Sequence, residues 1–503
     1  IISDNEVSRN DIGIEVMGPS PDYAPDMVSI NNTIMNNNVS ANKVFGVVLS
    51  YNATENMVIS NTANLNQEGG ILLYSSSNNT ITNNTASENK YGIRLDSSDG
   101  NEITSNTADS NTQNHGIWLW ESCHNIVTNN TADLNNEGGI CLDFSSNNAL
   151  TNNTAEENNH CGIQLFQESH NNTVMNNTAN ENKEGGICLE FSSNNTLMTN
   201  TVNSNEGDGV HLHDSSNNTL VNNTAFDNGN GIRLDASCVN RLIDNEAHNN
   251  TYNGITLEAS SSNNNLTKNT VYNNLYNGIW LRNSCNNNTL TNNIASSNNM
   301  TGIHLEDSSN NNALTNNTVS TNTRKGIRLC GSSNNTLTNN TAFNNTEIGI
   351  GLKDSSNNNT LTNNTVSTNT GGIYLDNSNS NSIYNNYFNN TNNAWDNGNN
   401  VWNITKTAGT NIIGGPYLGG NYWSDYAGVD TNGDGLGDTL LPYNSSGNIT
   451  NGGDWHPLVP GAAVLIELEL KTGWNMVSVP VIPANNSVGS VFPSHQEPIG
   501  IRI

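Results

Sequence analysis

Residues 211–235 read HLHDSSNNTLVNNTAFDNGNGIRLD, and most of this stretch recurs along the chain. The recurring signature is a Gly, then Ile or Val, then a Leu two residues later. From Gly46 to Gly372 these glycines are spaced 22–24 residues apart, and a degenerate copy at Gly13 brings the total to sixteen. Such a fixed period is the mark of a protein built from stacked repeats.

The pattern inside each repeat predicts three short strands joined by three turns. Ile and Leu of G-I-x-L lie on one side of a strand, because strand side chains alternate. An apolar residue follows eleven positions after most of the glycines, as at Leu197 and Leu220, and a small residue such as Ala155 ends an N-T-A stretch. We therefore predict an all-β parallel β-helix of about sixteen coils over residues 1–395. A leucine-rich repeat is the main alternative, but Ser, Thr and Asn are poor helix formers.

Asparagine is unusually abundant. The chain has 110 Asn in 503 residues, and 100 of them lie at or before residue 400. Stacked turn amides that bond to one another along the axis would satisfy groups that are otherwise buried without partners. We expect many of the N-x-T/S sequons to be locked in such ladders, so that a minority on exposed turns is glycosylated.

Charge limits the partners. The chain has 45 acidic and 16 basic residues and a formal net charge of −29, which argues against nucleic acid and against an anionic membrane surface. Cations and polysaccharides or cell-surface glycans stay open as partners. No apolar run is long enough for a transmembrane span. The chain begins in mid-pattern without Met and without a signal peptide, so we expect a processed or cut chain. The oligomeric state is not defined by these features.

The variable residues are concentrated at two positions of each repeat, the x of G-I-x-L and the residue after Leu. Both should point outward and form two columns on one face. From Gly92 onward these 26 positions include 12 charged and 5 aromatic residues, so this face is the candidate binding surface. Exposed rings suit stacking on sugars. The expected carbohydrate-binding residues are Trp118, Trp120, Phe166, Trp280, Tyr374, Arg94 and Asp96.

Two other kinds of chemistry are possible on the same face. His211 and His213 share one coil, with Cys188 on the coil before, and this set suits copper or zinc. Asp235 beside Glu258 is a carboxylate pair suited to acid–base chemistry on a sugar, with Glu190 as a further candidate. Opposite charges at neighbouring strand positions are also ordinary structural pairs.

The seven cysteines are Cys123, Cys141, Cys161, Cys188, Cys238, Cys285 and Cys330. Those at equivalent positions of the repeat are at least two coils, or about 10 Å, apart, which is too far for a disulfide. We therefore expect free thiols.

Repeats stop before residues 396–460, which we expect to form a cap with a calcium-type loop. The expected ligands are Asp430, Asn432, Asp434, the carbonyl of Leu436, and Asp438. Their spacing matches the first part of an EF-hand loop, but Leu441 replaces the twelfth-position Glu. Asp425 or Asp454 would have to complete the shell. Residues 461–503 have longer apolar strands and suggest the start of a β-sandwich-like module.

The coils, together with YNNYFNNTNNAWDNG at 384–398 and GGNYWSDYAGVDTNGDGLGD at 419–438, resemble the NosD-like β-helix family. The likeness is greatest to exported tandem-repeat members from methanogenic archaea. It implies a right-handed parallel β-helix of the type found in carbohydrate-binding proteins and sugar hydrolases. The family's namesake is a periplasmic protein implicated in copper delivery. The GWNMVSVPV stretch at 473–481 resembles modules of secreted archaeal surface proteins.

The sequence therefore favours an exported, extracellular cell-surface β-helix that binds carbohydrate in a structural or adhesive role. The first alternative is a polysaccharide lyase or hydrolase that uses Asp235, Glu258 or Glu190. The second is a copper- or zinc-handling protein that uses His211, His213 and Cys188.

Overall fold

The computed structural model describes residues 1–19 and 29–461. The chain divides into two units, Ile1–Pro460 and Gly461–Ile503. The β-sandwich-like module expected at 461–503 lies outside the described residues apart from Gly461. No helix within the described residues has the length and apolar character of a membrane span.

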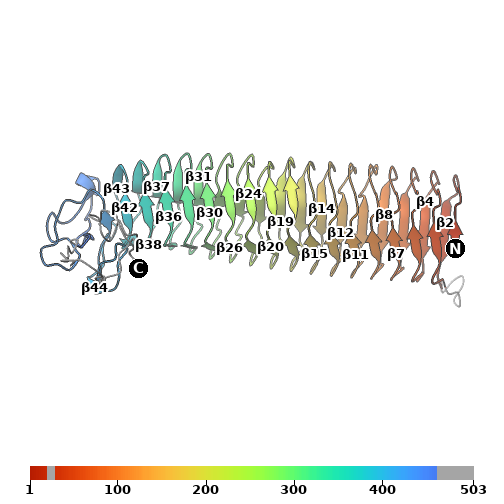
Figure 1. Ribbon diagram of the computed structural model, residues 1–503, viewed down its shortest axis with the longest axis horizontal. Helices are drawn as coiled ribbons and strands as arrows, with labels where there is room; N and C mark the ends of the chain where they lie inside the picture. The colour runs from red at the N-terminus through yellow and green to blue at the C-terminus, as the bar shows by residue number, and fades with distance from the viewer. Residues whose placement is uncertain (20–28, 462–503) are drawn as a thin grey trace, which may run out of the picture. The chain divides into compact units, whose positions relative to one another are not determined.

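The first unit is a parallel β-helix in which each repeat forms one coil (Figure 1). The G-I-x-L segments stack in register as one sheet, the G-I-x-L sheet, whose strands follow one another along the chain. The sixteen predicted copies and β43 form it, and its strands are β2 (Ile12–Met17), β4 (Phe45–Ser50), β6 (Gly69–Tyr74), β8 (Tyr91–Asp96), β10 (Ile117–Trp120), β12 (Ile140–Asp143), β14 (Cys161–Phe166), β16 (Gly185–Glu190), β19 (Asp208–His213), β22 (Ile232–Asp235), β25 (Ile255–Glu258), β28 (Ile279–Leu281), β31 (Thr301–Glu306), β34 (Lys325–Cys330), β37 (Ile348–Lys353), β40 (Gly371–Asp376) and β43 (Asn392–Asp396).

The apolar residue eleven positions after the glycine lies in a second sheet, the T-L-T sheet. Its strands are β1 (Ile2–Ser3), β3 (Thr33–Met35), β5 (Met57–Ile59), β7 (Thr80–Thr82), β9 (Glu102–Thr104), β11 (Ile126–Thr128), β13 (Ala149–Thr151), β15 (Thr173–Met175), β17 (Thr196–Met198), β20 (Thr219–Val221), β23 (Arg241–Ile243), β26 (Asn265–Thr267), β29 (Thr289–Thr291), β32 (Ala313–Thr315), β35 (Thr336–Thr338), β38 (Thr360–Thr362) and β41 (Ser382–Tyr384).

The N-T-A segments form the third sheet, the N-T-A sheet, which is regular only in the later coils. Earlier coils have single bridges there, such as Thr131 with Thr154. Its strands are β18 (Thr201–Asn203), β21 (Thr224–Phe226), β24 (Glu246–His248), β27 (Thr270–Tyr272), β30 (Ile294–Ser296), β33 (Thr318–Ser320), β36 (Thr341–Phe343), β39 (Thr365–Ser367), β42 (Tyr387–Asn389) and β46 (Tyr422–Trp423). The cap adds β44 (Thr407–Ala408), β45 (Tyr417–Leu418) and the short 3-10 helix η1 (Ser445–Gly447).

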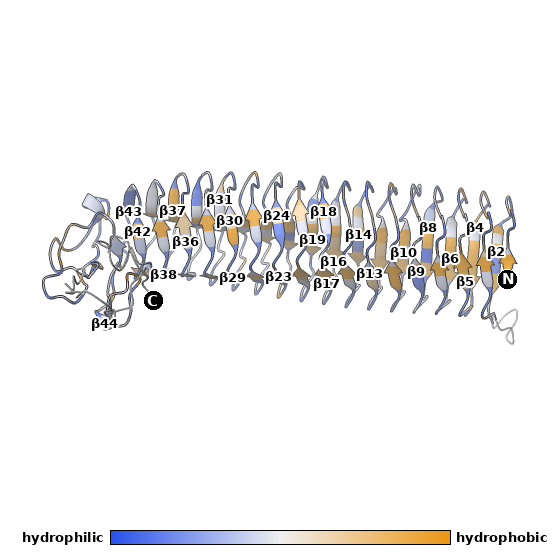
Figure 2. Cartoon of the chain, viewed as in Figure 1, coloured by the Kyte–Doolittle hydropathy of each residue, from blue (hydrophilic) through white to orange (hydrophobic). Residues whose placement is uncertain are grey.

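The core is filled as the repeat predicts. In β14, Ile163 and Leu165 are fully buried, whereas Gln164 and Phe166 are half-buried on the outside. The small residue of the N-T-A stretch is also buried, as at Ala155. Hydrophobic residues accordingly gather on the strands and hydrophilic residues on the turns (Figure 2). Since each coil presents the same small set of inward residues, the coils stack without adjusting to one another.

Three columns of buried asparagines bond the coils together at their corners. Asn200 donates Nδ2 to Oδ1 of Asn223 at 2.9 Å, and Asn223 donates to Asn245 at the same distance. The backbone N–H of Asn223 also donates to Asn245, and its Nδ2 donates to the Leu197 carbonyl of the preceding coil. The predicted amide ladders are thus present, and they satisfy the buried turn backbone and most of the ladder side chains; Asn195 and Asn240 keep an unpartnered Nδ2.

The residue before each ladder asparagine turns the chain. Asn217, Asn222 and Asp227 have φ angles of 58°, 52° and 57°, the left-handed region that Asn and Asp tolerate best among residues with a side chain. This position is also the acceptor of each N-N-T sequon, as at Asn222 before Asn223 and Thr224, and Asn222 is exposed. The expectation that the ladders shield sequon acceptors is therefore wrong: the ladder residue is the middle one of the sequon.

Each ladder ends on an aspartate in the C-terminal region. Asn421 donates its N–H to Asp454 at 2.7 Å, Asn393 donates Nδ2 to Asp425 at 2.6 Å, and Asn400 donates Nδ2 to Asp396 at 2.9 Å. The hydrogen bonds from one ladder asparagine to the next all donate toward this end, so an acceptor-only carboxylate complements the last donors.

This arrangement gives Asp425 and Asp454 a role other than the calcium ligation considered from the sequence. Asp454 is fully buried and also accepts a hydrogen bond from Trp423 Nε1. Burial raises the pKa of Asp454 to about 7, against the hydrogen bonds from Asn421, Trp423 and His456.

We predict that Asn223→Ala destabilises the surrounding coils by about 3 kcal/mol or more, because several buried donors and acceptors lose partners at once. Hydrogen exchange of β17, β20 and β23 measures this local loss, and the melting temperature should fall with it. The adjacent Asn222→Gly is the matched control, since Asn222 is exposed and glycine accepts its left-handed φ. Equal effects of the two substitutions would contradict the ladder's role.

Candidate functional site

The outward residues of the G-I-x-L sheet lie in register from coil to coil. Trp280 is opposite His304, and His304 is opposite Arg328. In-register residues on neighbouring strands are about 4.8 Å apart, so consecutive side chains in a column touch. The face predicted from the sequence is therefore a continuous surface, and its local groupings decide what it can bind.

Trp118, Trp120, Arg94 and Asp96 form one cluster. The guanidinium of Arg94 lies 4.4 Å from the Trp118 ring centre and 5.1 Å from that of Trp120, and it pairs with Asp96 at 3.1 Å. Burial raises the pKa of Asp96, against the attraction of Arg94. These four predicted carbohydrate-binding residues are brought together, but the protein's own guanidinium occupies the ring faces.

A hollow of about 500 Å³ lies beside Trp280. We call it the Trp280 hollow. Tyr252 and Tyr276 line it with rings that are 51% and 45% exposed, and Trp280 lies on its floor, where Arg282 stacks on the indole at 4.4 Å. The amides of Asn253 and Asn277 form part of its wall. It therefore combines open aromatic faces with polar groups.

A second hollow of about 490 Å³ lies four coils further along the same sheet, beside Tyr374. The Tyr374 ring stacks on Trp395 of β43, with centres 4.3 Å apart. Phe166, by contrast, stands in register with Asp143 and stacks on no aromatic ring among the described residues.

Sequence reasoning missed Tyr252, Tyr276 and Trp395. The two tyrosines precede G-I-x-L in a repeated Tyr-Asn-Gly-Ile, at 252–255 and 276–279, and this recurrence was the available signal. Trp395 belongs to a last strand without the Gly signature, so only the register with Tyr374 reveals it.

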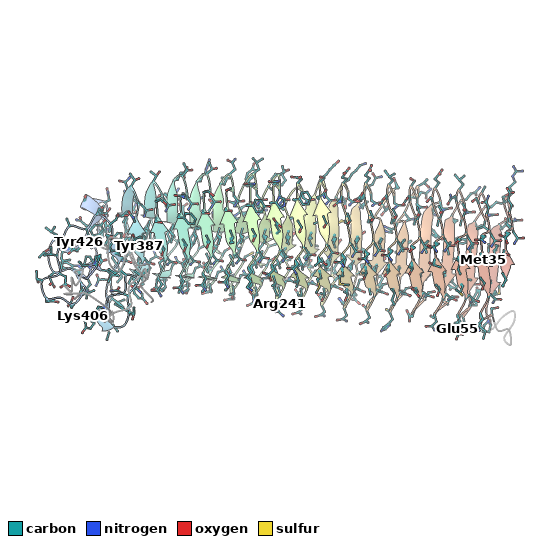
Figure 3. All side chains as sticks on the ribbon, viewed as in Figure 1. Met35, Glu55, Arg241, Tyr387, Lys406 and Tyr426 are labelled. Atoms are coloured by element: carbon teal, nitrogen blue, oxygen red, sulfur yellow. A yellow bond between two sulfur atoms is a disulfide. The ribbon has the colours of Figure 1, made fainter. Side chains whose placement is uncertain are left out.

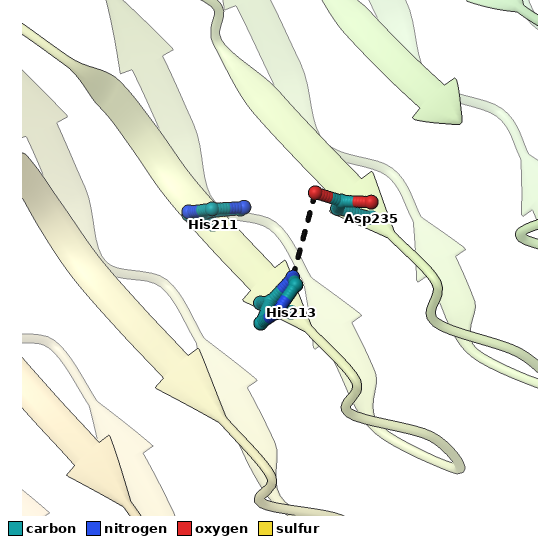
Figure 4. Close-up of side chains that lie close together, drawn as sticks. All are labelled: His211, His213 and Asp235. Carbon is teal, nitrogen blue, oxygen red and sulfur yellow. Dashed lines mark ion pairs between the residues drawn. The ribbon is translucent and has the colours of Figure 1, made fainter. Parts of the chain in front are cut away.

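His211, His213 and Asp235 form a second kind of group, in which one nitrogen or oxygen atom from each residue lies within 4.8 Å of the others (Figure 4). His213 Nδ1 is 3.4 Å from Asp235. His211 Nε2 is buried without a hydrogen-bond partner among the described residues. Burial lowers the pKa of His211, against the attraction of Asp208, so its imidazole is neutral and suited to a metal.

The expectation that all cysteines are free is wrong, because Cys161 and Cys188 form a disulfide with Cα atoms 6.1 Å apart. Cys161 starts β14 in register with Gly185, three residues before Cys188. The two occupy different positions of the repeat, so comparing equivalent positions does not pair them. Cys188 is consequently no thiolate, and the expected metal set is reduced to the two histidines plus Asp235.

The carboxylates proposed for catalysis are held by arginines. Glu258 is 5% exposed, and its two oxygens accept hydrogen bonds from Arg233 at 2.5 Å and Arg282 at 2.6 Å. Asp235 lies 3.4 Å from the same Arg233. Glu190, in register with His213, has no ion pair among the described residues. Both oxygens of Glu258 are therefore engaged by arginines on a nearly buried side chain, which favours a structural role for it.

The calcium-type loop lies in the cap, near Lys406 (Figure 3). Asp430 accepts hydrogen bonds from the backbone N–H groups of Gly433 and Gly435, both at 2.7 Å. Slight burial raises the pKa of Asp430, but the backbone hydrogen bonds outweigh it and the pKa is lowered. Lys406 pairs with Asp434, and the side chain and backbone of Thr431 lower the pKa of Asp438. Calcium on Asp430, Asn432, Asp434, Leu436 and Asp438 stays a prediction.

Comparison with known proteins agrees with this architecture. The profile described as "Right handed beta helix region" matches residues 69–225, so the fold is a right-handed parallel β-helix. The profile described as "Periplasmic copper-binding protein (NosD)" matches residues 1–115, 203–315 and 283–428. The chain belongs to the NosD family. Among curated proteins, none matches its sequence.

Solved structures with similar folds are distant. The periplasmic alginate epimerase AlgG has 14% identity and a TM-score of 0.35, covering 58% of this chain and 77% of its own. The A-module of the Azotobacter vinelandii mannuronan C-5 epimerase AlgE6 has 16% identity and a TM-score of 0.42, covering 61% of this chain and 86% of its own. The catalytic domain of a GH87 alpha-1,3-glucanase has 10% identity and a TM-score of 0.32, covering 69% of this chain and 60% of its own. No ligand or reaction is inferred from these likenesses.

We predict that the unfolded, unreduced protein titrates with five thiols, those of Cys123, Cys141, Cys238, Cys285 and Cys330. Cys188→Ser should raise this number to six, because it frees Cys161. A reading of seven thiols for the unreduced wild-type chain would contradict the disulfide.

Proposed function

We propose that this protein binds a glycan chain on its G-I-x-L sheet, with the Trp280 hollow as the main contact. The observation behind the proposal is the pair of half-exposed tyrosine rings, Tyr252 and Tyr276, at a hollow floored by Trp280. Aromatic faces stack on the C–H faces of sugar rings, and a purely structural strand face gains nothing from leaving them open.

The polar groups of the Trp280 hollow are also those that sugar hydroxyls need. The backbone N–H and Nδ2 of Asn277 donate to Asn253 Oδ1, which places a row of oriented amides along the wall. Thr256 also lines the hollow, where its hydroxyl donates to Asn230 at 3.3 Å and fixes that amide. Such a mixture of apolar faces and a few fixed polar groups is typical of small-molecule and glycan sites.

The two hollows suggest an extended ligand. Four coils separate β28 from β40, which corresponds to about 19 Å along the stack. A polymer laid along the sheet would reach both the Trp280 hollow and the Tyr374–Trp395 stack. Binding without cleavage fits the arginine-held Glu258 better than the lyase or hydrolase alternative does.

A location outside the cytoplasm fits this role. Disulfides persist mainly in oxidising compartments, and Cys161–Cys188 is one. A net charge of −29 keeps a surface protein soluble and apart from nucleic acid. We therefore place the chain on the outside of the cell, in a structural or adhesive role.

We predict that the protein is retained on one or more immobilised polysaccharides and that Tyr276→Ala weakens retention about tenfold, because an open stacking surface is lost. Tyr74→Ala is the matched control, since Tyr74 is 41% exposed on a distant coil. Affinity electrophoresis across a polysaccharide panel measures retention. New reducing or unsaturated chain ends would instead support the enzyme alternative, and no retention on any polymer would refute the glycan proposal.

A copper or zinc site on His211, His213 and Asp235 is the second candidate function. The observation that favours it is the convergence of these donors beside a buried, unpartnered His211 nitrogen, in a chain of a family described as copper-binding. Two imidazoles and a carboxylate suit either metal. The 4.8 Å spread exceeds the ligand separation around one ion, about 3.3 Å for bonds near 2.1 Å, so small rotations are needed.

For this site we expect one copper or zinc ion per chain after dialysis, and a higher melting temperature with metal, because the ion binds only the folded coils. His211→Ala should abolish both effects. His124→Asn, at an exposed turn, should leave them intact. Elemental analysis gives the stoichiometry, and unchanged binding by His211→Ala would exclude the site.

A further inference from the structure

Two cations beside the Trp280 hollow have no anionic partner. Lys325 and Arg328, both on β34, form no ion pair within 4.0 Å among the described residues. By contrast, Arg233 and Arg282 at the same hollow are both bound to Glu258. In a chain with 16 basic and 45 acidic residues, two adjacent unpaired cations on a half-buried face are unexpected.

A neutral histidine stands between these cations and the aromatic floor. His304 is 5% exposed, lines the Trp280 hollow, and has its Nε2 buried without a hydrogen-bond partner among the described residues. Burial lowers its pKa to about 3, and the charges of Arg328 and Lys325 act in the same direction. Its ring stacks against Trp280, with centres 6.3 Å apart. A buried polar atom without a partner is costly, so it points to a ligand group.

Carboxylates near the two cations form no ion pair with either of them among the described residues. Burial lowers the pKa of Lys325 and repulsion from Arg328 and Lys353 adds to this, with Glu347 opposing. Glu306 accepts a hydrogen bond from Trp280 Nε1, and Lys353 pairs with Asp354 at 3.8 Å. The Nε of Arg328 is also buried without a partner among the described residues.

Gly351 is in register with Arg328 on the next coil and leaves room for the Lys325 side chain beside it. Most other coils have a side chain at this outward position, whereas Gly351 has none. A Cβ built there would meet Lys325 Cδ at 3.7 Å, so the Lys325 side chain lies over this gap. This position lies between Arg328 and Tyr374 along the column, on the side of Arg328 toward the second hollow.

We propose that Arg328, Lys325 and His304 select an acidic sugar unit, one that bears a carboxylate or a sulfate, while Tyr276 holds its ring or that of a neighbouring unit. This inference rests on the proposed glycan binding and adds its substrate class. Guanidinium groups bind carboxylate and sulfate through paired charge-assisted hydrogen bonds. The protein's net charge of −29 repels a polyanion in general, so an acidic glycan binds only where local cations hold it.

Calorimetry with three matched four-residue oligosaccharides tests the proposal: an oligogalacturonide, its carboxyl-reduced neutral counterpart, and a sulfated form of that neutral oligomer. At 0.15 M salt, where charges beyond about 8 Å are screened, one or both acidic forms should bind at least about tenfold more tightly than the neutral one. Which acidic form binds identifies the anionic group.

Arg328→Gln should remove this preference and leave the weaker affinity for the neutral oligomer unchanged within about twofold, since Gln keeps part of the packing. Lys325→Met is a second variant with the same expectation, should Arg328→Gln fail to fold. Arg241→Gln, on the exposed side of the T-L-T sheet (Figure 3), is the control and should behave as wild type.

The outcomes separate the two proposals. Equal affinity for the acidic and neutral oligomers, or a preference that survives both variants, would overturn the acidic-sugar inference and leave glycan binding intact. Loss of the preference in Arg241→Gln as well would show nonspecific attraction and also overturn the site. No binding of any oligomer by the folded wild type would overturn both.

Discussion

The rest of the structure depends on the hydrogen bonds between buried asparagine amides along the stack. Each ladder residue bonds to the next coil, and many also donate to a carbonyl of the preceding coil, as Asn223 does with Asn245 and Leu197. Every amide of a ladder points the same way, so the columns have a direction and need an acceptor at one end. Asp396, Asp425 and Asp454 supply it. The cap therefore does more than cover the last coil, since it also terminates the three columns electrostatically.

This constraint determines where variation is possible. The glycine, the inward Ile and Leu, and the ladder asparagines are fixed by stacking, which leaves the outward strand positions free to differ. The face of the G-I-x-L sheet therefore holds the Trp118–Arg94 cluster, the His211–His213–Asp235 group and the Trp280 hollow in succession along one axis. Strands at a fixed rise hold most of these groups in place, and the turns before β25 and β28 add Tyr252 and Tyr276, an arrangement suited to a repeating polymer.

Most of the fold was predictable from the sequence, because period, strand alternation and turn chemistry all point to one architecture. The site was predictable only in part. The outward columns were right, including Trp280 and His211, but the sequence could not show that Arg94 stacks on Trp118 or that Arg233 and Arg282 hold Glu258. The Cys161–Cys188 disulfide was not predicted, because its two cysteines occupy different positions of the repeat. Such contacts depend on side-chain reach between coils, which spacing alone does not specify.

The most direct test of the account is a crystal structure of the protein with the oligosaccharide that it binds most tightly. We expect electron density for a sugar ring on Tyr276, with an acidic substituent within hydrogen-bond distance of Arg328. Density confined to the Trp118 cluster, to the N-T-A sheet or to the cap would contradict this expectation, because the ligand would then not contact the Trp280 hollow, where open rings lie beside unpaired cations.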